Sequence, residues 1–122
     1  MSARILAVDD SASVRMTTTI ALSNAGYQVT EAVDGQDGLN KICNGAFDLV
    51  VTDLNMPNMN GLEMIEAVRK LPSQAGLPMI FLTTESDGAL KARAKQAGAT
   101  GWMTKPFDPE RLVTIVRKVL GK

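Results

Sequence analysis

The chain has 122 residues, of which 45% are hydrophobic, and its 13 basic and 13 acidic residues give a formal net charge of zero. This length suits one domain with its own hydrophobic core. The balanced charge argues against nucleic-acid binding through a broad basic surface. No apolar run approaches the length needed to span a membrane, and the N-terminus MSARILAV lacks the features of a signal peptide. We therefore expect a single cytoplasmic domain covering residues 1–122.

The predicted strands are short apolar runs. The second alternates apolar with polar residues and reads as an edge strand, whereas the first, third and fourth are continuously apolar, which is typical of a parallel sheet covered on both faces. In chain order the predicted strands are residues 5–8, 27–33, 49–51, 79–82 and 101–103.

Helical patterns separate these strands, with recognisable start and stop residues. Gly26 ends the first predicted helix, Asp34 can cap the second, and Asp108 followed by Pro109 opens the last. In chain order the predicted helices are residues 11–25, 34–44, 62–71, 89–97 and 109–120. Five strand-helix repeats predict an α/β fold with a doubly wound, five-stranded parallel sheet of flavodoxin-like order 2-1-3-4-5 and helices on both faces.

The composition also limits the chemistry. The chain contains no His and a single Cys, which excludes Ser-His and Cys-His nucleophile pairs, argues against a zinc site, and means that the chain cannot itself be a phosphohistidine carrier. We interpret Cys43 as a small buried or half-buried hydrophobe.

Polar residues follow the predicted strands at the edge where ligands bind in open parallel sheets. They are Asp9, Asp10, Asp53, Thr83, Thr84 and Lys105. Taken singly, an Asp after a strand is commonly a turn residue or a helix cap. Three carboxylates together would repel by about 4 kcal/mol per pair at about 4 Å and an effective dielectric near 20, which favours a bound cation.

The segment after Asp53 does not fit a calcium loop. An EF-hand that started at Asp53 would need Gly at its sixth position and Glu at its twelfth, and the chain has Asn58 and Met64 there. Asp53 is also too far from the next helical pattern to cap it, because Pro57 and Gly61 intervene. Magnesium held by Asp10, Asp53 and a backbone carbonyl, for which Asn55 is the candidate, fits better.

With magnesium bound, Asp53 keeps a free oxygen that could accept a phosphoryl group as an aspartyl phosphate. The ammonium of Lys105 and the hydroxyl of Thr83 could then neutralise or bind the phosphoryl oxygens. The residues therefore predict phosphoryl transfer to Asp53.

Four motifs carry a resemblance to the receiver domain of two-component response regulators, in particular to free-standing chemotaxis regulators of the CheY kind, and it covers essentially the whole chain. The motifs are Asp9-Asp10, the run DLNMPNMNGLE from residue 53 to residue 63, Thr83-Thr84-Glu85, and Lys105-Pro106-Phe107.

The resemblance implies that Asp53 accepts phosphate from a histidine kinase in a magnesium-dependent reaction. Asp10, Asp53 and the Asn55 carbonyl would hold the ion, and Asp9 would act through a coordinated water. Lys105 would pair with the phosphoryl group and Thr83 would move toward it.

The resemblance also implies the roles of several flanking residues. Asn55 and Glu85 would tune a short phosphoryl lifetime, and the peptide bond before Pro106 would be cis. Trp102 stands where the family usually has a Tyr or Phe that takes part in switching, so the indole departs from the pattern.

We expect no enzymatic activity beyond magnesium-dependent self-phosphorylation and self-dephosphorylation. The expected partners are a histidine kinase, a downstream protein such as a flagellar motor switch protein, and a phosphatase, with no nucleic acid and no membrane, and we expect a monomer. Because the chain stops at Lys122 without an output domain, we expect the signal to leave through the fourth helix, fifth strand and fifth helix.

Three alternatives stay open. Within the receiver family, the chain could be a phosphorelay carrier or a phosphate sink without a motor target. A flavodoxin-like cofactor binder needs a phosphate-binding loop after the first strand, where this chain presents Asp9 and Asp10. A magnesium-dependent phosphohydrolase of the dehalogenase type would carry D-x-D there.

Overall fold

The computed structural model describes residues 3–54, 59–74, 76–83, 88–104 and 107–121. Its five strands form one parallel sheet of order β2-β1-β3-β4-β5, which confirms the predicted architecture. The strands are β1 (Arg4–Val8), β2 (Gln28–Ala32), β3 (Leu49–Asp53), β4 (Met79–Thr83) and β5 (Gly101–Thr104). Strand β2, which was predicted to be an edge strand, lies at one end of the sheet, and β5 lies at the other.

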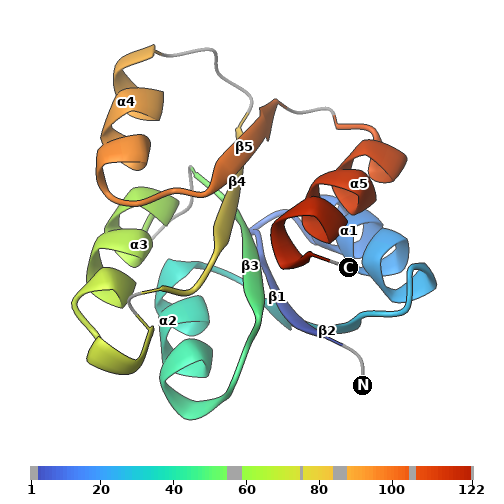
Figure 1. Ribbon diagram of the computed structural model, residues 1–122, viewed down its shortest axis with the longest axis horizontal. Helices are drawn as coiled ribbons and strands as arrows, with labels where there is room; N and C mark the ends of the chain where they lie inside the picture. The colour runs from blue at the N-terminus through green and yellow to red at the C-terminus, as the bar shows by residue number, and fades with distance from the viewer. Residues whose placement is uncertain (1–2, 55–58, 75, 84–87, 105–106, 122) are drawn as a thin grey trace.

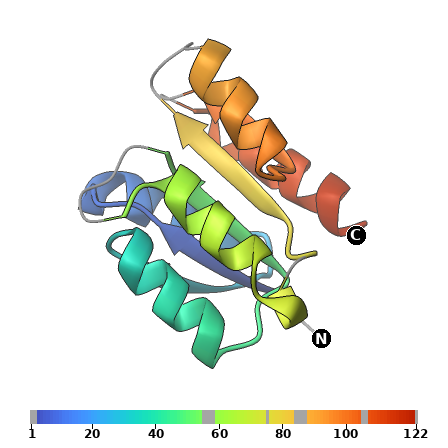
Figure 2. The same ribbon diagram turned by 90° about the vertical axis from the view of Figure 1, so that its left-hand side faces the viewer.

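Helices cover both faces of the sheet (Figure 1). One layer, which faces the viewer in Figure 2, consists of α2 (Gly35–Asn44), α3 (Gly61–Arg69) and α4 (Gly88–Gln96). The other layer consists of α1 (Ala12–Asn24) and α5 (Pro109–Leu120). A short 3-10 turn, Pro72–Gln74, follows α3. Among the described helices, none combines the length and hydropathy needed to cross a bilayer.

The sheet separates two hydrophobic clusters because successive side chains of a strand point to opposite faces. Along β1, Ile5 belongs to the cluster beneath α1 and α5, and Leu6 belongs to the cluster beneath α2, α3 and α4. Both side chains are fully buried. Strands β3 and β4 are buried along their whole length, which agrees with their continuous apolar runs.

The helices start at the capping residues that the sequence offers. The Asp34 carboxylate accepts from the amide of Asp37 at 2.8 Å, and Asp108 caps α5 with Pro109 as its first residue. The start of α3 differs from the prediction by one residue. Asn60 and Glu63 form a reciprocal capping box, so Gly61 is already helical.

The expectation for Cys43 is wrong. Its side chain is exposed, because its neighbour Ile42 takes the inward position on α2 and is buried.

Arg69 joins three segments on the side of α3 and α4. Its guanidinium donates to the carbonyl of Leu77 at 2.8 Å and to that of Gly98 at 2.7 Å. Burial lowers the pKa of Arg69 below its ordinary value, yet a guanidinium stays charged at neutral pH. The side chain thus links the end of α3 to the chain before β4 and to the turn before β5.

Candidate functional site: an acidic cluster at the sheet edge

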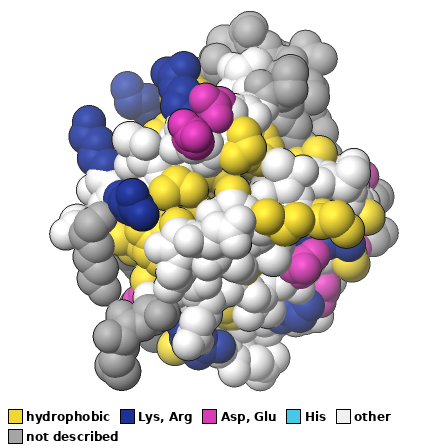
Figure 3. Space-filling model, turned by 90° about the vertical axis from the view of Figure 1, so that its right-hand side faces the viewer, with side chains coloured by type: hydrophobic (Ala, Val, Ile, Leu, Met, Phe, Trp, Pro, Cys, Tyr) yellow, Lys and Arg dark blue, Asp and Glu magenta, His cyan; other side chains and the backbone are white. Residues whose placement is uncertain are grey.

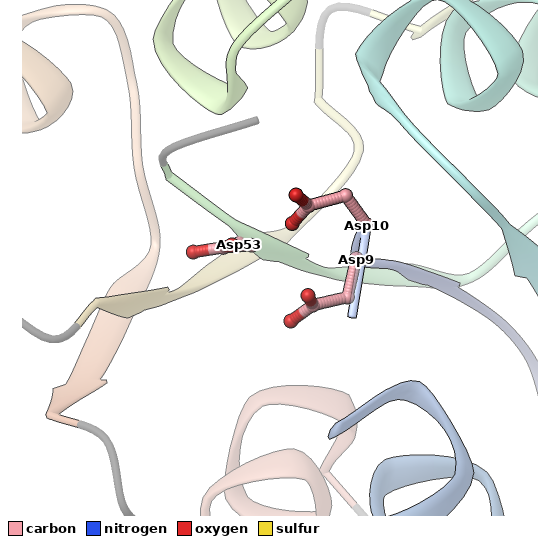
Figure 4. Close-up of side chains that lie close together, drawn as sticks. All are labelled: Asp9, Asp10 and Asp53. Atoms are coloured by element: carbon pink, nitrogen blue, oxygen red, sulfur yellow. The ribbon is translucent and has the colours of Figure 1, made fainter. Parts of the chain in front are cut away.

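The strand register brings three predicted site residues together. Val8 pairs with Thr52 across β1 and β3, so the residues that follow them, Asp9 and Asp53, are neighbours at the carboxyl edge of the sheet. One carboxylate oxygen each from Asp9, Asp10 and Asp53 lies within 4.8 Å of the others. Figure 4 shows the three side chains pointing into the same space at the ends of β1 and β3.

The cluster combines two buried carboxylates with one exposed carboxylate. Asp9 is 3% exposed and Asp53 is 7% exposed, whereas Asp10 faces solvent. At such separations each pair of charges would repel by about 3 to 4 kcal/mol at an effective dielectric near 20, with less for pairs that include the exposed Asp10. A divalent cation would turn this repulsion into attraction.

The donor set fits magnesium. Magnesium prefers oxygen ligands and is usually bound through one or two carboxylates together with waters and phosphate oxygens. Asp9, Asp10 and Asp53 offer three carboxylates at one point of the sheet edge, and the exposure of Asp10 leaves room for water. The residues present therefore suit a hard divalent cation.

Backbone contacts hold Asp9 in place. Its amide donates to the carbonyl of Ala32 at 3.1 Å, which extends the β1–β2 ladder by one residue. Its carboxylate accepts from the amide of Ser11 at 2.9 Å, and this contact forms a local turn before α1. The β1–α1 corner is consequently fixed at both the main chain and the side chain of Asp9.

Thr83 lies beside Asp53, as predicted. Asp53 pairs with Leu82 of β4, so Thr83 is the next residue at the same edge, and its side chain is buried. Thr83 in turn pairs with Thr104 of β5. Its hydroxyl group thus comes from the strand next to the acidic cluster.

Trp102 sits on β5, opposite Phe81 of β4. It is half-buried and packs against the cluster that includes Ala94 of α4. Trp102 also lines a pocket of about 400 Å³ together with Phe107 and Arg111. The indole therefore lies between the core beneath α4 and a hollow beside α5.

Several predicted residues fall outside the part of the chain that the structure describes. They are Asn55, Thr84, Glu85, Lys105 and Pro106.

Sequence reasoning missed two residues at this site. The amide of Gly61 donates to the Leu54 carbonyl at 2.9 Å, and a Cβ at Gly61 would lie 2.5 Å from the carbonyl oxygen of Asp53. Arg15 donates to the carbonyl of Asp9 at 2.7 Å. The Asn60-Gly61 pair at the start of α3 was a visible signal for the first residue, whereas the second sits inside α1 and gave none.

Comparison with known proteins agrees with this geometry. The family model described as "Response regulator receiver domain" matches residues 5–117. A probable chemotaxis protein CheY of Rhizobium etli is 36% identical over 119 residues, which cover 97% of this chain and 92% of that protein. The response regulator ArlR of Staphylococcus aureus is also 36% identical over 119 residues, and this chain spans 53% of its length.

Solved structures of other proteins have a fold very similar to that of this chain. Chemotaxis protein CheY4 of Vibrio cholerae superposes with a TM-score of 0.93 at 42% identity, covering 98% of this chain and 99% of that one. The chain therefore belongs to the response regulator receiver domains of two-component signalling, and its relatives include chemotaxis proteins of the CheY type.

Proposed function

We propose that this protein is a phosphorylation-controlled signalling switch in which Asp53 accepts a phosphoryl group from the phosphohistidine of a kinase. The observation that supports it is the close approach of three carboxylates, within 4.8 Å, around Asp53 at the sheet edge of a receiver domain. Asp53 is the last residue of β3, which is buried along its whole length. Its carboxylate therefore lies where the hydrophobic core meets the carboxyl edge of the sheet.

The transfer forms a bond between a carboxylate oxygen of Asp53 and phosphorus while the phosphorus–nitrogen bond of the donor breaks. The electron pair of that bond returns to the donor imidazole, which takes up a proton. Later attack by water on phosphorus releases inorganic phosphate and restores the Asp53 carboxylate. The protein would thus act only on its own side chain and on no other substrate.

Magnesium would neutralise the charge that develops on the phosphoryl oxygens. Asp10, Asp53 and the carbonyl of Asn55 would hold the ion, and Asp9 would contact it through a water. The hydroxyl of Thr83 and the ammonium of Lys105 are the chain's own donors to the phosphoryl oxygens.

One contact cannot drive such a switch. A change from about 1% to about 99% of the active form requires about 5.5 kcal/mol of differential interaction. A hydrogen bond from Thr83 to a charged oxygen contributes about 1.5 to 3 kcal/mol. Phosphorylation, Lys105 and partner binding must therefore act together, and partner binding must in turn favour the phosphorylated form.

The output surface we propose consists of α4, β5 and α5. It contains the pocket of about 400 Å³, which combines aromatic walls from Trp102 and Phe107 with the cation of Arg111. Mixed aromatic and Arg surfaces are typical of protein-binding sites.

The charge distribution indicates the kind of partner. Residues 1–66 contain three basic and nine acidic residues, whereas residues 67–122 contain ten basic and four acidic residues. The second group includes β4 and β5 at one end of the sheet.

Lys and Arg side chains gather on one side of the face that carries α1 and α5 (Figure 3). The exposed cations of α4 and α5 include Arg93, Lys95, Arg111, Arg117 and Lys118. An acidic protein segment therefore suits the output surface.

The chemotaxis relatives make a flagellar motor switch protein the first candidate for this partner. A phosphorelay carrier or a phosphate sink uses the same acceptor chemistry without such a target, so a binding experiment separates these roles.

The test compares immobilised protein in magnesium and beryllofluoride, which mimics a phosphoryl group on the acceptor, with the Asp53→Asn variant under the same conditions. We expect a cellular protein to be retained by activated wild-type protein and not by Asp53→Asn. Equal retention by both would contradict a phosphorylation-dependent switch. Magnesium-dependent phosphoryl transfer without any retained target would favour the carrier or sink.

A further inference from the structure

We propose that Arg15 is the positioning residue of the metal site, and that it acts by fixing the peptide group between Asp9 and Asp10. This inference rests on the proposed function in one respect, because it assumes that the acidic cluster binds a divalent cation. It assigns a role to a basic residue beside the three carboxylates of Asp9, Asp10 and Asp53.

The guanidinium of Arg15 spans from α1 to two neighbouring strands. Its Nη1 donates to the backbone carbonyl of Asp9 at 2.7 Å, and its Nε donates to Oε1 of Glu31, on β2, at 3.0 Å. The Arg15 side chain is only 16% exposed, whereas that of Glu31 is 45% exposed. The contact with the carbonyl is therefore the more protected of the two.

The carbonyl of Asp9 belongs to the peptide group that joins Asp9 to Asp10. This group is planar, so a donor that holds the carbonyl oxygen also sets the direction in which the chain enters Asp10. The amide of Asp9 is already held by the Ala32 carbonyl at 3.1 Å. Because Arg15 donates to the carbonyl of Asp9, the main chain is fixed on both sides of the Asp9 Cα atom. The carboxylates of Asp9 and Asp10 are therefore attached to a rigid stretch of backbone.

Arg15 could affect a bound cation in two ways, and the two have opposite signs. As a positive charge near the site, it would repel the cation, and its removal would strengthen binding. As a clamp on the carbonyl, it would keep the carboxylates in position, and its removal would weaken binding. The geometry favours the clamp because the short, protected bond goes to the backbone.

The test measures magnesium affinity by calorimetric titration and, separately, the rise of the unfolding midpoint on addition of magnesium. The proteins compared are wild type, Arg15→Met, Arg15→Lys and Glu31→Gln. We expect Arg15→Met to bind magnesium about 10-fold more weakly, the size typical for loss of a group that orients metal ligands. Arg15→Lys keeps one donor that can reach the carbonyl, so its loss should be smaller.

Glu31→Gln is the matched control. It removes a charge near the same guanidinium and leaves an oxygen for Nε, so the clamp predicts an affinity close to that of wild type. A purely electrostatic role predicts that Glu31→Gln weakens binding and that Arg15→Met strengthens it. Should Arg15→Met fail to fold, Arg15→Lys decides, because the clamp predicts a smaller but measurable loss of magnesium affinity for this variant, whereas affinity equal to or above that of wild type would overturn the positioning role.

Different results would contradict the metal-dependent function and the positioning role of Arg15. Wild-type protein that binds no magnesium would overturn the proposed metal-dependent function. Wild-type binding that Arg15→Met equals or exceeds would overturn only the positioning role of Arg15.

Discussion

Asp10 is the exposed member of a carboxylate group whose other two members, Asp9 and Asp53, are buried. The charge of Asp10 should therefore affect the stability of the folded protein in opposite directions with and without bound metal. In the metal-free protein its charge adds repulsion, and in the metal-bound protein it adds a ligand.

We therefore expect Asp10→Asn to stabilise the metal-free protein by about 1 kcal/mol, after allowance for solvent screening of an exposed group. The same variant should lose most of the stabilisation that magnesium gives to wild type, since a ligand that binds only the folded state stabilises according to its affinity. Urea unfolding with and without magnesium measures both changes.

Glu66→Gln provides the control, because Glu66 is an exposed carboxylate on α3. Its effect should stay within about 0.5 kcal/mol in both conditions. Asp10→Asn protein that is less stable without magnesium, or equally stabilised by it, would contradict the account of a strained acidic cluster.

At the scale of elements, the packing of α3 against the end of β3 limits residue 61 to Gly. A Cβ at Gly61 would lie 2.5 Å from the Asp53 carbonyl oxygen and 2.9 Å from a ring carbon of Phe81, and both neighbours belong to the buried sheet. The start of α3 is therefore in close, rigid contact with Asp53, the proposed phosphoacceptor.

We expect Gly61→Ala to destabilise the protein by about 1 to 3 kcal/mol, the usual cost of an added methyl group in a packed site. Because the strain falls on the Asp53 backbone, magnesium affinity should fall as well. Gly76→Ala is the matched control, since a Cβ there would meet no atom within 4 Å. Chemical unfolding and magnesium titration of both variants check the prediction, and equal stability of the two would show that α3 can move away from β3.

Much of the fold could be predicted from the sequence because its elements carry local signals. Buried parallel strands give continuous apolar runs, and Asp34, Asp108 and Pro109 mark helix starts. The start of α3 was placed one residue late because a pattern that begins at the first apolar residue, Leu62, overlooks a Gly that follows a capping Asn. The outward face of Cys43 was missed because helical periodicity alone did not show which side of α2 packs inward.

The site was predictable to the extent that it depends on strand ends. Asp9, Asp10, Asp53 and Thr83 lie at or just after the carboxyl ends of strands that share one sheet edge, so topology alone brings them together. The contributions of Arg15 and Gly61 come from contacts with the backbone carbonyls of Asp9 and Leu54, and the hydrophobic periodicity of the sequence does not report such contacts.

At the scale of the whole molecule, the net charge of zero is the sum of two oppositely charged parts, the acidic residues 1–66 and the basic residues 67–122. The acidic part carries the proposed phosphoacceptor Asp53, and the basic part carries the proposed output surface. Complementary fields speed association more than they strengthen the final complex.

We therefore expect reversal of two exposed α5 cations, in an Arg117→Glu, Lys118→Glu variant, to slow association with the beryllofluoride-dependent partner about 10-fold or more at low salt. Lys41→Glu on α2 reverses one cation in the acidic part, half the charge change of the double variant, and should change the rate little. Surface plasmon resonance measures these rates. A similar slowing by Lys41→Glu would show that net charge, and not the output surface, governs the encounter.

The central claim is that a magnesium-dependent cluster prepares one carboxylate, that of Asp53, to accept a phosphoryl group. The most direct measurement is incubation with acetyl phosphate, with and without magnesium, followed by peptide mapping of the phosphorylated residue in wild type and in Asp53→Asn. We predict one phosphoryl group on Asp53, formed only with magnesium and absent from the variant. Labelling of a different residue, or labelling of Asp53 that does not depend on magnesium, would contradict the account.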